Sequence, residues 1–270
     1  MRVVPSMLVA ATAVFAASVA PCSGQTAPKA SAASAPPSTI SPPVVVTEAA
    51  ERLLKEMGAY IGSAGQFTFR TETTFDHVLP SGQKLQFNGQ ENVALVRPNG
   101  LYVEWGGDLG GRKLWYDGKE VTLLDSATQA YGVQPAPPTI DAMLDKVTEQ
   151  LRFTPPLSDF FVGDPYKALR ASVQYGFVVG ESQVNGRSCT GIAVVEKLID
   201  WQIWIETGPQ IVPCKLVITY KNHPSMPQFT AIFSEWDFSP RIAPSTFTPA
   251  LPAQARKIPF ATAQTTVGSK

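Results

Sequence analysis

Apolar and polar residues alternate through most of the chain after residue 65. From Gln66 to Phe75, three phenylalanines share one face of an extended chain while polar side chains share the other, as in a half-buried strand. The same period of two predicts further strands at Leu85–Arg97, Leu101–Trp105, Lys113–Tyr116, Val121–Leu124, Ala130–Val133, Tyr175–Val179, Cys189–Val195, Asp200–Glu206, Lys215–Lys221 and Phe229–Phe238. Turn sequences such as Asp117-Gly118 and Asn185-Gly186 connect them. The pattern predicts an antiparallel meander of about eleven strands.

Three segments instead repeat their apolar residues at helical spacing. Thr47–Ile61 begins with an N-cap residue and meets a stop signal at Gly62, and Thr139–Arg152 also begins with a cap. The third segment, Leu157–Ala171, divides into two short pieces at Asp164. This order predicts an α+β fold, in which a sheet too wide to stay flat curls around an N-terminal helix and an inserted helical segment.

The N-terminal residues 1–24 are typical of a secretory signal peptide. Arg2 precedes an apolar stretch that ends at Ala20, too short to span a bilayer, and we expect cleavage after Gly24. The mature chain would then carry no transmembrane anchor. Cys22 leaves open an alternative, in which a lipidated cysteine anchors the protein as a lipoprotein.

Composition separates the rest of the chain into a linker, one domain and a tail. Residues 25–46 are mostly Ala, Pro, Ser and Thr and predict a disordered linker, whereas 47–260 holds the folded domain and 261–270 a flexible tail. With 22 basic and 22 acidic residues, the chain is not expected to bind nucleic acid. A hydrophobic content of 44% supports one sizeable core.

Two cysteines, Cys189 and Cys214, remain after cleavage, and a cysteine pair in an exported protein predicts a disulfide. The predicted strands raise a geometric objection, because another strand would lie between the two cysteines. A bond then requires the sheet to bend. Two free buried thiols are the alternative.

Candidate catalytic groups are few. His77 and His223 lie near turns without acidic residues or cysteines at ligand spacing, so we expect no metal site and no cofactor. Glu104, Asp200 and Glu206 are interpreted as solvated strand positions and not as a catalytic pair. No nucleophile or phosphate-binding motif is present, and the sequence predicts a protein that is not an enzyme.

Apolar side chains on the inner face of the sheet are the most informative feature. The inserted segment, with Phe153 among its aromatic residues, resembles a plug that could move. Alternatively, the apolar rows simply pack against the helices and leave no void. The candidate ligand-lining residues are Phe67, Phe69, Phe87, Leu101, Val103, Trp105, Leu114, Tyr116, Met143, Val147, Phe160, Phe161, Trp201, Ile203, Ile205, Leu216 and Ile218.

Several motifs resemble known periplasmic proteins. RPNGLYVEW, followed by LWYDGKEVTLLD, resembles the lipoprotein-carrier superfamily of LolA and LolB, half-barrels whose concave face holds lipid chains. IDWQIWIE, PCKLVITYK and the closing FTPALPAQARKIPF are similar to the bacterial family of predicted periplasmic proteins called domain of unknown function twenty ninety-two. The similarity extends from Ala49 to Phe260. It implies the fold and the compartment but no activity. A basic residue is usual in that family where Cys214 stands, so the resemblance does not supply the disulfide.

These observations favour a non-enzymatic protein, periplasmic or secreted, that binds an apolar ligand such as a lipid or lipoprotein acyl chain in the concave face of a half-barrel. The alternative is an envelope protein-protein interaction or stress-sensing module with a filled core and no ligand. Trp204, expected to be exposed on an otherwise polar face, favours that alternative.

Overall fold

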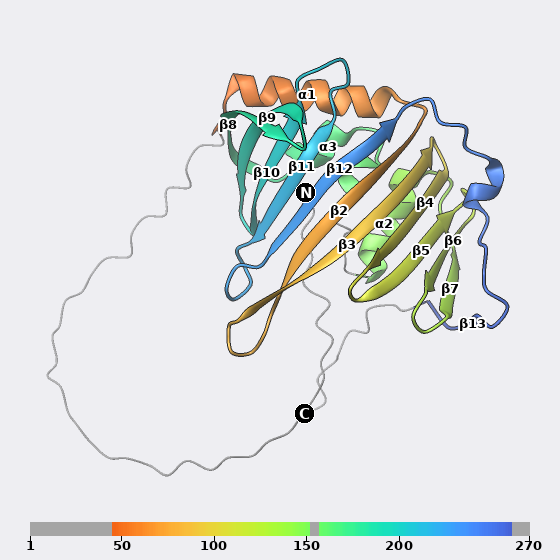
Figure 1. Cartoon of the computed structure of the whole chain (residues 1–270). Helices are drawn as coiled ribbons and strands as arrows, with labels where there is room; N and C mark the ends of the chain where they lie inside the picture. The colour runs from red at the N-terminus through yellow and green to blue at the C-terminus, as the bar shows by residue number, and fades with distance from the viewer. Residues whose placement is uncertain (1–44, 152–156, 261–270) are drawn as a thin grey trace, which may run out of the picture.

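A single open sheet of 13 strands forms the frame of the protein in the computed structural model, which describes residues 45–151 and 157–260. The predicted signal peptide, most of the predicted linker, the predicted tail and Phe153 lie outside the described residues. The sheet curls, and helices α2 and α3 lie on the side turned away from the viewer in Figure 1. The architecture is therefore the expected α+β half-barrel, with a largely antiparallel sheet that does not close on itself.

The sheet consists of two antiparallel meanders, one formed by β8 to β12 and the other by β2 to β7. They join where β12 pairs with β2. The order is β1-β8-β9-β10-β11-β12-β2-β3-β4-β5-β6-β7-β13. The strands are β1 (Val45–Val46), β2 (Gln66–Val78), β3 (Lys84–Val96), β4 (Gly100–Gly107), β5 (Gly110–Tyr116), β6 (Glu120–Asp125), β7 (Ala130–Pro135), β8 (Val173–Val184), β9 (Arg187–Glu196), β10 (Ile199–Glu206), β11 (Pro213–Tyr220), β12 (Gln228–Asp237) and β13 (Arg256–Lys257).

The strand predictions differ from the structure at the two sheet edges. All of the predicted strands are present, and the structure adds β1 and β13, which pair in parallel with β8 and β7. Val45 and Val46, assigned above to the linker, thus form an edge strand, and the Thr47 amide donates a 2.9 Å hydrogen bond to the Gly176 carbonyl. Two-residue strands leave no periodic signal in a sequence.

Helix α1 (Glu48–Ser63) lies across one end of the sheet (Figure 1). Its buried stripe includes Leu54, Met57 and Ile61, as the helical spacing predicts. The predicted stop at Gly62 is wrong, because the helix continues to Ser63. Gly62 instead allows the Gly163 backbone to lie close to α1, because a Cβ at this position would be 2.9 Å from the Gly163 carbonyl oxygen.

The inserted helical segment is made of α2 (Ile140–Leu151), the 3-10 turn η1 (Ser158–Phe160) and α3 (Pro165–Arg170). Two of the three predicted caps are present: the Thr139 hydroxyl accepts from the Ala142 amide at 3.3 Å, and the Asp164 carboxylate accepts from the Lys167 amide at 2.9 Å. The Thr47 side chain, in contrast, makes no cap hydrogen bond at the start of α1. The two α-helices of the segment therefore have capped starts, whereas η1 begins without a side-chain cap.

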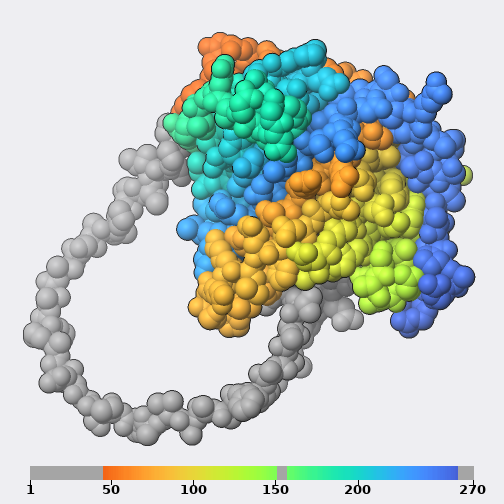
Figure 2. Space-filling view, viewed as in Figure 1, coloured from red at the N-terminus to blue at the C-terminus, as the bar shows by residue number. Residues whose placement is uncertain are grey.

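Strands β2 to β5 form a continuous outer surface (Figure 2). After β12 the chain runs along this end of the sheet to β13 and includes the turn η2 (Pro244–Phe247). The Phe247 ring lies where a Cβ of Gly100 would point, at 2.8 Å, so the C-terminal segment packs against the outer face of β4. The inner face is left to the helices.

Candidate functional site

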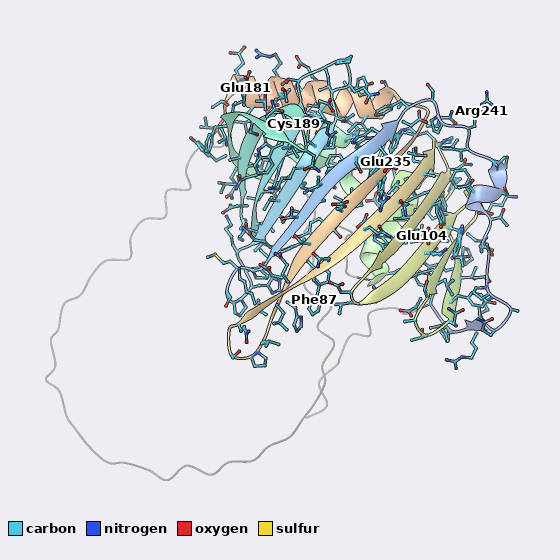
Figure 3. The ribbon with its side chains drawn as sticks, in the orientation of Figure 1. Phe87, Glu104, Glu181, Cys189, Glu235 and Arg241 are labelled. Atoms are coloured by element: carbon cyan, nitrogen blue, oxygen red, sulfur yellow. A yellow bond between two sulfur atoms is a disulfide. The ribbon has the colours of Figure 1, made fainter. Side chains whose placement is uncertain are left out.

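The core between the inner face of the sheet and the inserted helical segment holds nearly all of the predicted ligand-lining residues. Phe87 alone lies apart: it is half-buried near the end of the β2–β3 hairpin, where its ring pairs with Phe75 at 5.7 Å (Figure 3). Trp105 and Leu114 are half-buried against the main cluster. The remaining candidates are buried together in that cluster: Phe67, Phe69, Leu101, Val103, Tyr116, Met143, Val147, Phe160, Phe161, Trp201, Ile203, Ile205, Leu216 and Ile218.

Aromatic side chains of the inserted segment contact aromatic side chains of the sheet directly. The Phe160 ring meets the Phe233 ring edge-on with 5.5 Å between centroids, and Phe161 lies 6.2 Å from Phe69. Trp236 packs against Phe69 at 4.4 Å. These contacts mean that η1 occupies the concave face in this conformation, so the predicted lining forms a packed core beneath a helical cover.

Arg97 fastens this cover to the sheet. Its Nε donates to the Ala64 carbonyl at 3.2 Å and its Nη1 donates to the Phe161 carbonyl at 2.8 Å. The guanidinium also lies over the Phe67 ring, 5.9 Å from its centroid. Burial lowers the pKa of Arg97, and the nearby Asp141 carboxylate opposes that change. One side chain thus links the end of α1, the turn η1 and the sheet.

A second attachment joins the inserted segment to α1. The Tyr166 hydroxyl donates to Glu51, and the Arg170 Nε donates to the same carboxylate at 3.1 Å. Although burial raises the pKa of Glu51, hydrogen bonds from Tyr166 and Arg170 bring it below its ordinary value. Gly58 allows the close contact, since a Cβ there would lie 2.5 Å from the Tyr166 Cβ.

A cleft of about 310 Å³ lies between α2, η1 and α3. Four aspartates and Lys167 line it together with small and apolar residues: Asp141, Asp145, Asp159, Asp164, Leu144, Thr148, Ser158, Val162, Ala168 and Ala171. Asp141 is engaged there, because its carboxylate accepts the Gly163 amide at 3.1 Å. Since both sides of the cleft belong to the inserted segment, a movement of α2 against α3 would change its shape.

Glu91 is a buried carboxyl that sequence reasoning missed. It lies on the inner face of β3 with 6% of its surface exposed, opposite Thr71 on β2 and Trp105 on β4. Burial raises the pKa of Glu91 to about 7, and a hydrogen bond from the Trp105 side chain opposes that rise. Period-two counting from Phe87 along the predicted strand would have placed Glu91 on the inner face.

Glu196 is a second buried carboxyl, at the end of β9. Its Oε1 accepts the Trp201 indole N–H at 2.7 Å, and 2% of its surface is exposed. Burial raises the pKa of Glu196, while Trp201 and the positive charge of Lys221 act in the opposite direction. Lys221 also donates to the Glu196 carbonyl at 2.6 Å and to Asp200 at 2.7 Å. This carboxyl is therefore part of a polar network.

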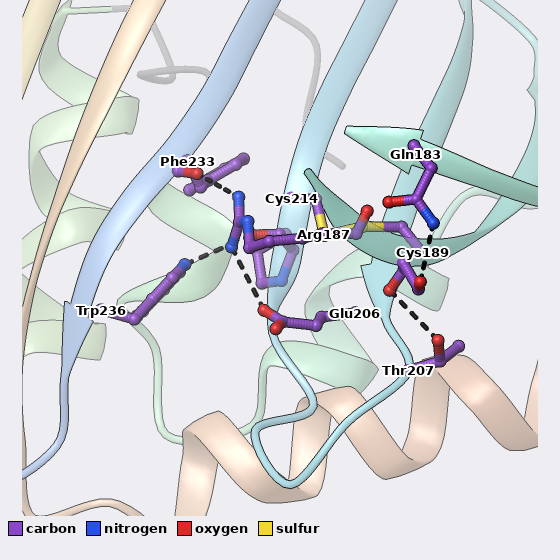
Figure 4. Close-up of a disulfide and its surroundings, with 10 residues drawn as sticks. Gln183, Arg187, Cys189, Glu206, Thr207, Cys214, Phe233 and Trp236 are labelled. Atoms are coloured by element: carbon purple, nitrogen blue, oxygen red, sulfur yellow. Dashed lines mark hydrogen bonds and ion pairs between the residues drawn. A yellow bond between two sulfur atoms is a disulfide. The ribbon is translucent and has the colours of Figure 1, made fainter. Parts of the chain in front are cut away.

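The predicted disulfide between Cys189 and Cys214 is present (Figure 4), with 6.9 Å between the Cα atoms. Strand β10 does run between the two cysteines, as the objection stated. Two strand spacings of a flat sheet would separate the Cα atoms by about 9.5 Å. The sheet therefore bends here, where the β10–β11 register shifts between Trp204 and Ile205.

Trp204 differs from the expectation of an exposed side chain. It is half-buried, packs beside the disulfide, and has the Lys215 amine 4.8 Å from its ring centroid. The exposed aromatic residues of the outer face are instead Tyr175 and Phe177 on β8, which are 43% and 38% exposed.

The candidate catalytic residues are dispersed. His77 is exposed, whereas His223 is half-buried with its ring 6.1 Å from that of Tyr220. Each suspected carboxylate pairs with a different base: Glu104 with Lys113 at 2.8 Å, Asp200 with Lys221 at 2.7 Å and Glu206 with Arg187 at 3.2 Å. Within residues 45–151 and 157–260, no three His, Cys, Asp or Glu side chains form a group able to hold a metal ion.

The chain is similar to several solved structures at low sequence identity. An uncharacterized conserved protein from Thermus thermophilus has a TM-score of 0.45 at 10% identity, covering 78% of this chain and 98% of that one. LprF from Mycobacterium bovis has a TM-score of 0.41 at 11% identity, covering 78% and 99%. A LolA superfamily protein from Nitrosomonas europaea has a TM-score of 0.33 at 8% identity, covering 74% and 97%.

The sequence itself was compared with curated proteins and with family models. No curated protein matches it. Among the described residues, no helix has the length and apolar character needed to cross a membrane. A family model described as "Predicted periplasmic protein (DUF2092)" matches residues 50–261, most of the chain and all but the first strand and the first helical residues of the described domain. The chain therefore belongs to this family of periplasmic proteins.

Proposed function

We propose that this periplasmic protein is a non-enzymatic binder of an apolar ligand, such as a lipid acyl chain, on the concave face of its half-barrel. The helical cover of α2, η1 and α3 would move away to admit the ligand. The ligand would then replace contacts that the cover makes in the closed form. Burial of its apolar chain would contribute about 25 cal/mol of binding free energy per Å² of apolar surface removed from water.

The nature of the cover is the observation that carries the proposal. Short helical pieces, and not a second hydrogen-bonded sheet, shield the apolar face. The turn η1 and the C-cap residue that follows it contribute Phe160 and Phe161, which are buried against sheet aromatics. The backbone is held here at the Phe161 carbonyl by Arg97. Such a piece can separate from the sheet without breaking any strand pairing, as a lid requires.

Two measurements test this function. Lipid extraction of the purified protein followed by mass spectrometry should find a bound amphiphile, and a fluorescent fatty-acid analogue should bind with saturation. Phe160→Leu, which weakens the cover, should speed probe uptake, whereas the matched Phe177→Leu on the outer face should not. Absence of both extracted lipid and saturable uptake, in the wild type and in Phe160→Leu, would refute the proposal.

A second function has an observation of its own. Tyr175 and Phe177 lie on the outer face of β8 and Val179 follows them at a register shift; all three are exposed, and β1 pairs with Tyr175 and Gly176. An exposed apolar edge of this kind suits a protein partner that adds a strand. If Phe177→Leu weakened capture of an envelope protein while no lipid was found, the interaction function would replace the first.

A further inference from the structure

One inner-face row of the sheet changes from aromatic to polar within a few strands. The register places Phe233 of β12 opposite Thr71 of β2, Thr71 opposite Glu91 of β3, and Glu91 opposite Trp105 of β4. Directly opposed side chains in antiparallel strands lie about 5 Å apart at Cβ. Glu91 and Thr71 are therefore neighbours at the border of the aromatic cluster.

Hydrogen-bonding capacity is left over at this border. An ionised carboxylate has about four acceptor sites, and Trp105 supplies one donor to Glu91. Thr71 is fully buried, and its hydroxyl has no hydrogen-bond partner. Buried polar groups in native proteins nearly always have partners, so this unused capacity requires an explanation.

Two cations adjacent to this row in the strand pairing make their contacts elsewhere. Arg112 of β5 lies opposite Trp105 in the same row, and its Nε pairs with the Asp125 carboxylate at 3.6 Å. Arg70, next to Thr71 in sequence, points to the other face and donates to Gln90 at 2.7 Å. In the part of the chain that the structure describes, no cation pairs with Glu91.

The cover borders this polar pair. Phe233, the neighbour of Thr71 in the row, is the ring that Phe160 of η1 meets edge-on. Phe161 contacts Phe69, which precedes Thr71 on the same face of β2. A displacement of η1 would therefore remove the aromatic contacts next to Thr71 and Glu91.

We propose that Glu91, Thr71 and Trp105 form a recognition site for a positively charged, hydrogen-bond-donating head group, such as a primary ammonium, on the apolar chain that the concave face binds. This inference rests on the proposed function and names its ligand class. An ammonium brings three donors and the charge that a buried carboxylate lacks. An anionic head group would be repelled.

Three single-chain probes with the same dodecyl tail separate the possibilities: dodecylammonium, dodecanol and dodecanoate. Their binding to the delipidated full chain would be measured by calorimetry below their micelle concentrations. We expect dodecylammonium to bind at least about tenfold more tightly than dodecanol, as a charge-assisted hydrogen bond allows, and dodecanoate to bind least.

Variants test whether the preference for dodecylammonium over dodecanol depends on Glu91 and Thr71. Glu91→Gln should reduce dodecylammonium binding to the dodecanol level and leave dodecanol unchanged, and Thr71→Val should weaken the preference. Glu196→Gln is the matched control, because Glu196 is also a buried carboxyl bonded to an indole, and it should retain the preference.

The outcomes of this experiment are distinguishable. Equal binding of all three probes by the wild type overturns the head-group site while the apolar-binding function stands. Equal loss of preference in Glu91→Gln and Glu196→Gln also overturns it. If no probe binds, the proposed function itself fails. The wild-type comparison needs no variant, so a folding defect in Glu91→Gln would not rescue the inference.

Discussion

Each of the two halves of the sheet buries a glutamate that accepts a hydrogen bond from a tryptophan, but the surroundings of the two glutamates differ. In the half formed by β8 to β12, Glu196 and Trp201 lie beside Lys221, and the disulfide crosses the same strands. In the half formed by β2 to β7, Glu91 has the half-buried Trp105 and the unpartnered Thr71 hydroxyl as its neighbours. The difference shows that the first half surrounds its buried carboxyl with partners, whereas the second retains an unsatisfied buried hydroxyl at the position of the proposed site.

The largest effect on stability should come from Trp201→Ala, with Trp105→Ala as its counterpart in the other half. Trp201→Ala empties a fully buried site and leaves Glu196 without its indole donor, so we expect it to lower the free energy of unfolding by about 3 to 5 kcal/mol. Trp105→Ala should cost roughly half of that, because Trp105 is half-buried. Urea unfolding monitored by circular dichroism measures both. Equal losses would break the comparison.

Removal of the disulfide tests the stable half directly. The double variant Cys189→Ser, Cys214→Ser should lower the free energy of unfolding by about 3.5 kcal/mol, because a loop spanning 25 positions is released in the unfolded chain. Thiol titration of the wild type under denaturing, non-reducing conditions is the chemical check. Two titratable thiols would show that the bond does not form in the protein.

Proton binding at Glu91 tests the other half. The folded-state pKa of about 7 lies above the ordinary 4.5, so the contribution of Glu91 to stability is fully present below pH 4.5 and is lost as the pH rises through 7. Glu91→Gln removes this dependence and should raise the free energy of unfolding by up to about 3 kcal/mol at pH 8, with little change at pH 4.

The control for this prediction is Glu196→Gln, for which we expect a smaller gain at pH 8 because Lys221 stabilises the charged form of Glu196. Chemical denaturation at both pH values supplies the comparison. A Glu91→Gln variant with the same pH dependence as the wild type would show that Glu91 is not the titrating group.

The smallest effect concerns the cover. Asp164→Ala removes the carboxylate that caps α3 and should lower the free energy of unfolding by about 1 kcal/mol. If the cover opens as a unit, hydrogen exchange of α3 amides should accelerate while amides of β9 and β10 stay protected. Uniform acceleration would indicate that the cover and the sheet open only together.

Sequence pattern was sufficient for the long strands and the capped helices, because period two and period 3.6 with cap residues are local signals. The edge strands β1 and β13 depend on parallel pairing of two residues each, which no local pattern encodes. Gly62 was misinterpreted for a related reason: its role is contact with Gly163, about a hundred positions away in the sequence.

The sequence predicted most of the residues of the candidate site, but it did not predict that the inserted segment fills the concave face. Alternation identified the inward-facing residues, whereas the filling of the face by Phe160 and Phe161 depends on where the inserted segment packs. Glu91 was not predicted as a site residue, because a single acidic position among the apolar residues of β3 carries no local signal of burial. Its burial could not be derived without the packing of the neighbouring strands.

The short strands at the two sheet edges have a consequence for aggregation. An open sheet exposes unpaired amide and carbonyl groups along its first and last strands, and these can recruit strands from other copies of the chain. β1 occupies the edge of β8 at Tyr175 and Gly176, and β13 occupies the edge of β7 at Ala130 and Tyr131. Two dipeptides from opposite ends of the domain thus shield part of each edge strand against fibril-like growth. Proteolytic trimming of either end would lengthen the exposed template for association while leaving the core intact.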